Sequence, residues 1–479
     1  MSDVQTKDKY ETFVGLEIHI HLLTDTKMFC GCKANYGDEP NTNVCPVCLG
    51  YPGVLPTVNE EAMKMGYAVA RALNCKLSRK TFFERKNYFY PDMPKNYQIS
   101  QFQEPVGVEG YLEFEYNGEI KKIRIHDVHL EEDAGKMIHA GDMSLQDFNR
   151  AGFPLLEIVT EPDLKSGEET EAFLRAFRRI VRYLGVCDGN MDEGSMKCDA
   201  NISINEWGKG LGTKTELKNM NSPRFVRRGL QYEAQRQAKV LDEGGKLAQE
   251  TRLWNENRDI TETMRTKEEA NDYRYFPEPD MPPFCPDDIF MAEVEASQVE
   301  LPLARKHKLM RKYNINSDQA EFIHDEKVNA DYFETVVSLG ADPQAIYTWL
   351  SSDVQKELNL LNMTLTESPL TAERFASLLK LIEDGTISGK IAKKVLIDIF
   401  EEDQDPAAIV EKKGLSQISD PAVIGEAIDK VLAANAQVVE AIKGGDQRQK
   451  GFLVGQIMKE TGGRAAPALV QKILAEKLG

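Results

Sequence analysis

The sequence predicts an α+β fold, with an N-terminal mixed α/β domain followed by helical domains. Up to about residue 295, short runs rich in β-branched and aromatic residues alternate with helical segments and with loops of Gly, Pro, Asn and Asp. These strands and helices follow no strict βαβ order, which favours α+β over a doubly wound sheet. From about residue 301, apolar residues recur only at helical spacing. A chain of 479 residues has room for two to four domains.

Each element follows from its local pattern. The expected N-terminal strands are 13–20, 111–116, 122–130, 155–160 and 201–205, and the expected helices are 60–73, 168–184 and 223–243. Further helices are expected at 305–313, 331–339, 372–383 and 390–401. An acidic, Pro-containing joint at 401–408 precedes a last helical segment. We therefore predict domains at 1–295, 296–404 and 405–479.

Four of the eight cysteines form two close pairs separated by twelve residues. They are Cys30, Cys32, Cys45 and Cys48. Four thiolates complete a tetrahedral zinc site and leave no open coordination position. We predict a structural zinc knuckle without a catalytic role; four unrelated buried cysteines are the alternative. The other cysteines are scattered, as expected of reduced thiols rather than a disulfide scaffold.

Composition limits the classes of partner. A formal net charge of −18 argues against indiscriminate binding along a nucleic acid backbone, although a local basic patch is compatible with it. The first dozen residues are polar and lack the apolar stretch of a signal peptide. No apolar run approaches the length of a membrane span. We expect a soluble, cytoplasmic protein without membrane contacts.

Segment 85–101 is the most unusual stretch of the chain. It combines four aromatic residues, three cations, one aspartate and two glutamines with two prolines, and it shows neither helical nor strand periodicity. So many polar groups are costly in a core, because each one buried without a partner costs about 1–3 kcal/mol. The mixture suits a surface that binds a nucleotide or a tRNA end. A loop packed against a domain edge is the alternative.

The strand expected at 13–20 has two distinct faces. Its apolar face carries Val14, Leu16, Ile18 and Ile20. Glu17, His19 and His21 then share the opposite face, because side chains alternate along a strand. A carboxylate beside an imidazole is half of a divalent metal site, whereas a polar solvent-facing surface is the alternative.

Two more segments supply carboxylates to such a site. Glu157 lies inside an apolar run, and a buried charge must find a partner or become neutral. Three acids adjoin at 131–133, which is unfavourable unless cations share the site. Together with Glu17 and His19 they would form an oxygen-rich site with one imidazole, which suits Mg²⁺ or Mn²⁺.

No standard nucleotide-binding or nucleophile motif is present: the chain has no GxxxxGK[ST] loop, no GxGxxG after a strand and no GxSxG elbow. Other motifs occur in a fixed order, namely GLEIHIH (15–21), RKNYFYPDMPKNYQISQ (85–101), HLEEDAGK (129–136), PLLEIVTEPD (154–163), KCDANIS (197–203), TELKNMNS (215–222) and DYRYFPEPD (272–280). Over nearly the whole chain, this set resembles the B subunit of the tRNA-dependent amidotransferase, GatCAB.

The resemblance implies a cradle domain that carries out ATP-dependent transamidation. Misacylated Glu-tRNA(Gln), Asp-tRNA(Asn) or both would be phosphorylated on the side-chain carboxylate, and ammonia would then displace the phosphate. An amidase (glutaminase) A subunit would supply the ammonia, and a small C subunit would complete a heterotrimer. The implied cofactors are ATP, Mg²⁺ or Mn²⁺, and a structural Zn²⁺.

The resemblance also indicates the site residues. It favours Glu132 over Glu131, because sequence spacing alone does not decide which of the two is a ligand. The predicted metal ligands are Glu17, His19, Glu132 and Glu157. Lys86 and Asp92 complete the predicted catalytic group, with Lys86 and Lys95 near phosphates. The predicted nucleotide-binding residues are Lys95, Tyr88, Tyr90, Lys218, Asn219 and Arg274. For each Lys or Arg among them, the alternative to ligand binding is a surface salt bridge or a charged group that is exposed to solvent.

The last segment, 405–479, is nearly neutral, with ten Lys and Arg against nine Asp and Glu. It resembles the helical module that reads the tRNA body in this family. Lys459, Gly462, Gly463 and Arg464 are the predicted tRNA-binding residues. The near-neutral charge predicts modest tRNA binding that depends on shape. The alternative explanation of the two glycines is that they cap the C-terminus of a helix.

Three other functions compete with this prediction. The first is a non-catalytic, zinc-containing tRNA-binding scaffold. The second is the archaeal paralogue that serves only Glu-tRNA(Gln), but it carries a large inserted domain for which this chain has no room. The third is a stand-alone metallohydrolase, which would turn over without ATP.

Overall fold

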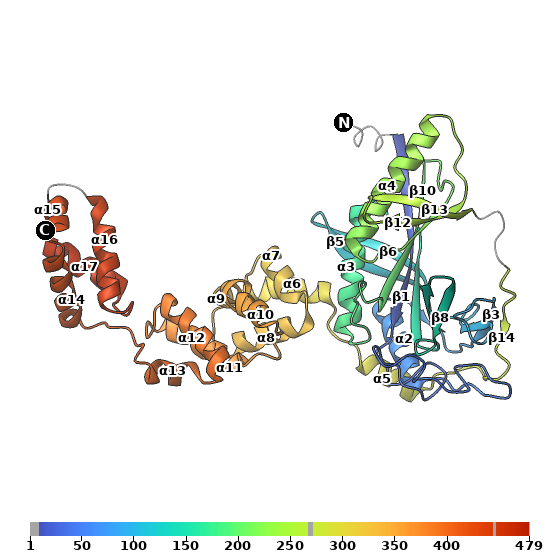
Figure 1. Cartoon of the computed structure of the whole chain (residues 1–479), viewed down its shortest axis with the longest axis horizontal. Coiled ribbons are helices and arrows are strands. Elements are labelled where there is room, and N and C mark those ends of the chain that lie inside the picture. Colours follow the sequence, from blue (N-terminus) through green and yellow to red (C-terminus); the bar gives the residue numbers. More distant parts are fainter. Residues whose placement is uncertain (1–8, 267–271, 444–446, 479) are drawn as a thin grey trace. The chain divides into compact units, whose positions relative to one another are not determined.

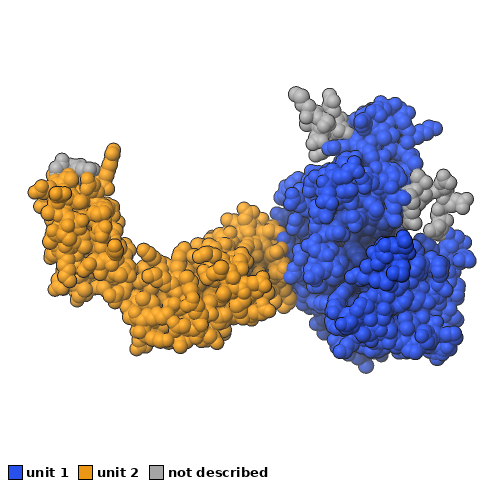
Figure 2. Space-filling model, viewed as in Figure 1, with its two compact units in different colours: residues 1–305 blue, residues 306–479 orange. Residues whose placement is uncertain are grey.

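The computed structural model describes residues 9–266, 272–443 and 447–478. The chain divides into two compact units, residues 1–305 and 306–479 (Figures 1 and 2). All strands of the described ranges lie in the first unit, and the described part of the second unit is helical. The predicted α+β class, with helical structure after the mixed domain, is confirmed.

One mixed sheet organises the first unit. Within the described ranges it has twelve strands, ten of which follow the order β13-β12-β11-β10-β1-β9-β6-β4-β3-β14, with β5 beside β6 and β2 beside β5. The central strands are β1 (Tyr10–His21), β10 (Met196–Glu206), β9 (Pro154–Thr160) and β6 (Glu119–Glu132), and each pairs with its neighbour in antiparallel fashion.

The remaining strands extend this sheet or form a separate hairpin. They are β2 (Lys76–Leu77), β3 (Glu84–Asn87), β4 (Tyr97–Ser100), β5 (Gly107–Tyr116), β11 (Thr215–Lys218), β12 (Glu250–Asn255), β13 (Ile260–Thr266) and β14 (Phe276–Pro277). Strands β11 and β12 are parallel, which makes the sheet mixed. The separate hairpin pairs β7 (Lys136–Ala140) with β8 (Met143–Asp147).

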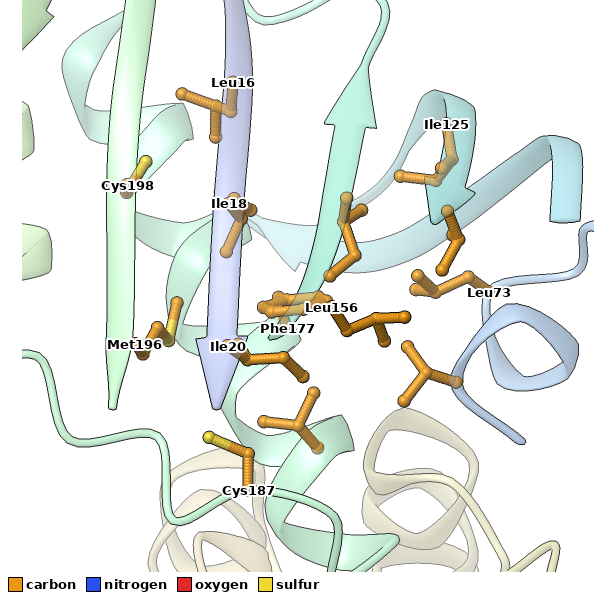
Figure 3. Packing of buried hydrophobic residues seen from close by; sticks show 14 of the residues in the cluster. Leu16, Ile18, Ile20, Leu73, Ile125, Leu156, Phe177, Cys187, Met196 and Cys198 are labelled. Carbon is orange, nitrogen blue, oxygen red and sulfur yellow. The ribbon is translucent and has the colours of Figure 1, made fainter. Parts of the chain in front are cut away.

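Helices cover the apolar face of this sheet. Helix α2 (Glu60–Ala72), α3 (Gly167–Tyr183), α4 (Pro223–Asp242) and α5 (Asp288–Ala296) each begin after an Asn, Ser or Asp whose side chain accepts a backbone hydrogen bond from the first turn. Figure 3 shows Leu16, Ile18 and Ile20 of β1 in one cluster with Leu156 of β9 and Phe177 of α3. The helix-covered face fixes the register, so Glu17 and His19 lie on the opposite face.

Every strand and helix predicted in the first unit overlaps an element of the same type. Segment 85–101 differs, because it contains two strands where no strand periodicity was visible. Strands β3 and β4 form an antiparallel hairpin of four residues each, and β14 pairs with its outer edge. Three successive residues of β4 are buried, so both of its faces are covered and no alternation marks it.

Helices form the second unit and have two separate cores; the first of these helices begins within the last residues of the first unit. They are α6 (Pro302–Tyr313), α7 (Ser317–His324), α8 (Lys327–Ser338), α9 (Pro343–Trp349), a π-helical turn (Leu350–Val354), α10 (Gln355–Leu361), α11 (Ala372–Glu383), α12 (Gly389–Glu402), α13 (Pro406–Lys412), α14 (Pro421–Ala434), α15 (Ala436–Lys443), a 3₁₀ turn (Gln447–Gln449), α16 (Lys450–Glu460) and α17 (Pro467–Leu478). One apolar cluster runs from Leu309 to Val410 and the other from Ile424 to Leu478. The division into three domains stays a prediction.

None of the helices in the described ranges has the length and apolar character that a membrane crossing requires.

Candidate active site

Three polar side chains from neighbouring strands form a row on the face of the sheet opposite the helices. His19 of β1 is paired in register with Glu157 of β9, which is in turn paired with His129 of β6. Residues directly opposite on adjacent strands have their side chains on the same face. The Nε2 atoms of His19 and His129 lie 3.1 and 3.2 Å from the same oxygen, Oε2 of Glu157. Glu157, whose side chain is 14% exposed, thus has two partners for its charge.

Glu131 completes a group that could hold a metal ion. Its Oε1 lies 3.7 Å from His19 Nε2, and one ligand atom each from His19, Glu131 and Glu157 lie within 4.8 Å of one another. Behind this group, Nδ1 of His129 is hydrogen-bonded to Asp127 at 2.7 Å. A carboxylate on the second ring nitrogen fixes the orientation of an imidazole in a site of this kind.

Charge coupling within the group is strong. Burial opposes the charged form of His19, but the carboxylates of Glu157 and Glu131 outweigh it and raise the His19 pKa to about 9. Glu157 and Asp127 likewise overcome burial and raise the pKa of His129 well above its ordinary value. The two imidazoles hold the pKa of Glu157 well below its ordinary value despite burial. Burial and the neighbouring Glu157 raise the pKa of Glu131. Protons therefore neutralise part of a strongly acidic group.

The row continues across β1 toward β10 and β11. Glu17 is paired in register with Asp199 of β10, and its Oε1 accepts a hydrogen bond from Asn201 Nδ2 at 2.9 Å. Lys218 of β11 is ion-paired with Asp199 and, at 3.1 Å, with Glu216. The carboxylates next to Lys218, Asp199 first, overcome burial and raise its pKa. The predicted residues Glu17 and Lys218 thus belong to the same face as His19.

Lys86 lies at the other end of the row, on β3. Burial opposes its charge, but Glu131 raises its pKa, with a contribution from Glu157. Its Nζ is 5.0 Å from the centre of the Tyr273 ring, and the Tyr88 ring meets Tyr273 edge to face at 6.0 Å. The structure therefore brings the predicted Lys86 and Tyr88 to the acidic group.

Glu132 is not brought into this group. It follows Glu131 on β6 and so points to the opposite face, where it is buried, ion-paired with Lys95 and accepts a hydrogen bond from Ile99 N at 2.8 Å. The predicted residues Glu132 and Lys95 therefore bind each other in this structure, and the third carboxylate beside His19 is Glu131.

Four other predicted residues have separate surroundings. Tyr90 is exposed, and the backbone carbonyl of Asp92 accepts a hydrogen bond from Gly135 N at 2.8 Å. Asn219 has a left-handed backbone with φ of 66°, and its side chain donates to Trp254 O at 3.1 Å. Arg274 is exposed, with φ of 50°. The structure shows no contact of these side chains with the acidic group among its described residues.

A second polar cluster supports the end of β1. His21 Nε2 lies 2.7 Å from Asp133 Oδ2, and the Tyr36 hydroxyl is hydrogen-bonded to the other ring nitrogen. Arg150 Nε lies 3.2 Å from the same Asp133 oxygen. Despite burial, these partners hold the pKa of Asp133 below its ordinary value, with His21 making the largest contribution. Tyr36 lies between the two cysteine pairs, so this cluster ties the knuckle to the sheet.

The four predicted zinc ligands come together. The sulfur atoms of Cys30, Cys32, Cys45 and Cys48 lie within 4.8 Å of one another, which confirms a cluster that could hold a metal. An all-thiolate set of four suits zinc in a closed, tetrahedral structural site.

The predicted tRNA-binding residues surround the end of α16. Gly462 and Gly463 have φ of 61° and 80°, and Gly463 N donates to Met458 O at 2.6 Å, which is a glycine-capped helix end. Arg464 Nη1 donates to Gly414 O at 3.0 Å, whereas Lys459 is exposed. Capping accounts for the two glycines; a role in tRNA binding stays a prediction.

Sequence reasoning passed over Glu131 in favour of Glu132 and did not single out His129, Asp127 and Asp199. A signal for the first three was present, because Asp127, His129 and Glu131 alternate along one strand and therefore share a face. The same alternation places Glu132 on the other face. Asp199 had no such signal, since its place beside Glu17 depends on the register of β1 against β10.

Comparisons with known proteins show the family of this chain. Residues 12–292 match the GatB/GatE catalytic domain, and residues 331–478 match the GatB domain. The chain belongs to the GatB family. It is similar to proteins named as the B subunit of aspartyl/glutamyl-tRNA(Asn/Gln) amidotransferase: 46% identical to that of Carboxydothermus hydrogenoformans, over 98% of this chain and 99% of the relative. The protein of Moorella thermoacetica is 48% identical over 98% of this chain and 100% of its own length.

Proposed function

We propose that this chain is the transamidating subunit of a tRNA-dependent amidotransferase. It binds misacylated Glu-tRNA(Gln), Asp-tRNA(Asn) or both, and it transfers the γ-phosphoryl group of ATP to the side-chain carboxylate. Ammonia then attacks the acyl phosphate, phosphate leaves, and Gln-tRNA(Gln) or Asn-tRNA(Asn) is the product. The ammonia comes from a glutaminase A subunit, and a small C subunit completes the heterotrimer.

The observation that carries this proposal is the composition of the polar face. His19, Glu157 and Glu131 gather potential ligand atoms within 4.8 Å, while Lys86 and Lys218 lie toward its two ends with raised pKa values. Phosphoryl transfer depends mainly on positioning and on neutralising phosphate charge. A surface with divalent-ion ligands between two cations supplies both.

The ion-binding residues follow from the same geometry. His19, Glu157 and Glu131 would hold Mg²⁺ or Mn²⁺, with Glu17 beside them, since one imidazole among carboxylates is a donor set for such ions. When bound, the divalent ion neutralises the phosphate oxygens of ATP. Glu131 takes the place that the resemblance gave to Glu132.

The chain's own side chains have distinct tasks in this reaction. Lys86 holds the transferred phosphoryl group, because its ammonium is next to Glu131 and Glu157 and backed by the Tyr273 ring. Tyr88 and Tyr90 offer rings on which the nucleotide stacks, and Asp92 orders the loop between β3 and β4. Asn219 and Arg274 remain candidates for contacts with the nucleotide or the tRNA end.

Two further parts of the proposal lie outside the reaction. The four cysteines hold a structural Zn²⁺ that closes the knuckle and takes no part in catalysis, because a closed site cannot activate water. The helical end of the chain reads the tRNA body, with Lys459, Gly462, Gly463 and Arg464 nearest to it.

The test is amidation by the assembled complex with ammonium chloride in place of glutamine. Wild type and His19→Ala are compared for ADP release and Gln-tRNA formation, with ATP and Mg²⁺ and with tRNA binding measured in parallel. His126→Ala is the matched control, because its side chain is 64% exposed on β6, which is separated from β1 by β9. We expect His19→Ala to lose both products while still binding tRNA, and His126→Ala to keep both.

Other outcomes identify the competing functions. Equal amidation by wild type and His19→Ala would make this chain a tRNA-holding scaffold with the chemistry elsewhere. Turnover without ATP would indicate a metallohydrolase.

A further inference from the structure

Lys27 is a fully buried cation placed against the cysteine cluster. Its side chain has no exposed surface, and its Nζ lies 3.7 Å from Cys48 Sγ and 3.2 Å from the backbone carbonyl of Phe148. Its backbone N–H donates to Cys32 O at 2.9 Å. Both the main chain and the side chain of Lys27 therefore contact the segments that carry the cysteines.

Among the residues that the structure describes, this ammonium forms no ion pair with a carboxylate, and the polar partners of its side chain are one sulfur and one backbone carbonyl. Glu132 lines the same small cavity as Lys27, but it is ion-paired with Lys95. A buried ammonium is strongly unfavourable unless an opposite charge compensates it. The cysteine sulfurs are the remaining source of negative charge at this position.

We propose that Lys27 is the counter-cation of the metal-bound cysteine cluster and donates an N–H···S hydrogen bond to the thiolate of Cys48. This inference rests on the zinc proposed above. When Zn²⁺ binds, the four thiols lose four protons, and four thiolates around a divalent ion leave a net charge of −2. The Lys27 ammonium reduces this to −1 inside a buried environment, so the metal and the lysine stabilise each other.

The same side chain connects the cysteine cluster to the segment behind Asp133, which belongs to the second polar cluster at the end of β1. The Phe148 carbonyl that Lys27 contacts begins a segment whose Gly152 O accepts a hydrogen bond from Met28 N at 2.8 Å. Gly152 N in turn donates to Asp133 O at 2.8 Å. A Cβ atom at Gly152 would lie 3.5 Å from Lys27 Cδ. The bound metal therefore fixes the segment behind Asp133 through Lys27, without any role in the chemistry.

The experiment uses the full chain loaded with Zn²⁺ or with Co²⁺. Lys27→Met removes the charge and keeps an apolar chain of similar length, Lys27→Arg keeps the charge, and Lys33→Met is the control, because Lys33 is an exposed lysine next to Cys32. Release of Zn²⁺ to an excess of chelator is timed, and the sulfur-to-cobalt charge-transfer band is recorded. Replacing a residue that hydrogen-bonds to a metal ligand typically changes the metal affinity 10–100-fold.

We expect Lys27→Met to release zinc at least 10-fold faster than wild type and to shift the charge-transfer band to lower energy. Lys33→Met should match wild type, and Lys27→Arg should fall between wild type and Lys27→Met. The melting temperature provides a second readout. With zinc, Lys27→Met should melt below wild type; without zinc it should melt at or above wild type, since the buried charge then has no counter-charge.

Each contrary result has a distinct meaning. A wild-type chain that binds no metal refutes the zinc site itself. A wild-type chain that binds zinc, with equal release and an unchanged band in Lys27→Met, refutes the role of Lys27. If Lys27→Met fails to fold although metal-free wild type folds, Lys27 serves the fold independently of the metal, and the inference is wrong.

Discussion

Replacing Glu157 by Gln should uncouple the two histidines of the candidate active site. Glu157 Oε2 is the atom that His19 and His129 share, at 3.1 and 3.2 Å. Glutamine has nearly the same shape as glutamate but no charge. The perturbation therefore removes the electrostatic attraction while it leaves the packing of β9 nearly unchanged.

The expected magnitude follows from the pKa of His19. A value of about 9, against an ordinary 6.5, corresponds to about 3 kcal/mol in favour of the imidazolium. This is an upper value, because the His19 side chain is 23% exposed and water screens part of the attraction. Glu157 is nearer than Glu131, which lies at 3.7 Å, so its charge supplies the larger share. We expect Glu157→Gln to lower the His19 pKa by at least one pH unit, roughly 1.4 kcal/mol.

The assay is an NMR titration of histidine-labelled protein in buffer free of Mg²⁺ and Mn²⁺, with zinc retained. Glu161→Gln is the control, because Glu161 is bonded to the exposed His126 at 2.9 Å. A His19 pKa that is the same in wild type and Glu157→Gln would refute the coupling, as would a wild-type value near 6.5.

The same coupling predicts how stability depends on pH. The pKa of His19 is raised on folding, so its contribution is complete below about pH 6.5 and is lost as the pH rises through about 9. The pKa of Glu157 is lowered from 4.5, so its contribution is complete above about pH 4.5 and is lost in more acidic solution. The melting temperature of wild type should therefore exceed that of Glu157→Gln most strongly between about pH 4.5 and 6.5.

Three other substitutions test the fold, the site and the tail. Leu156→Ala should lower the free energy of unfolding by about 2–5 kcal/mol, measured by urea denaturation of the first unit's transition, because this side chain is fully buried between β9 and the helices. Lys86→Met should reduce ADP formation at least 100-fold in the amidation assay and leave tRNA binding intact; an unchanged rate would contradict its phosphate role. Arg464→Ala should destabilise the tail by about 1 kcal/mol, seen as a lower melting temperature, because it loses the bond to Gly414 O.

The sequence was most informative where a strand has one buried face. Alternation in 13–20 separates Ile18 from His19, and the structure shows Ile18 in the core and His19 in the acidic group. Alternation in 127–131 would also have selected Glu131 over Glu132, since the two neighbours must point to opposite faces.

Long-range register could not be predicted in the same way. His19 meets Glu157 because β9 lies beside β1, and no property of either segment alone determines which strand becomes its neighbour. The short strands β3 and β4 were missed for a related reason, because residues buried on both faces show no alternation. Lys27 was missed because a lone lysine in a sequence carries no sign of its burial.

The chain's acidity and its proposed work on phosphates are reconciled by where the cations lie. An acidic protein with a net charge of −18 repels polyanions over most of its surface. On the polar face, however, carboxylates hold His19, His129, Lys86 and Lys218 in their charged forms by raising the pKa of each. Under the proposed function, phosphate groups and a divalent ion would bind at this surface, and a tRNA end would be selected by fit there rather than by general electrostatic attraction.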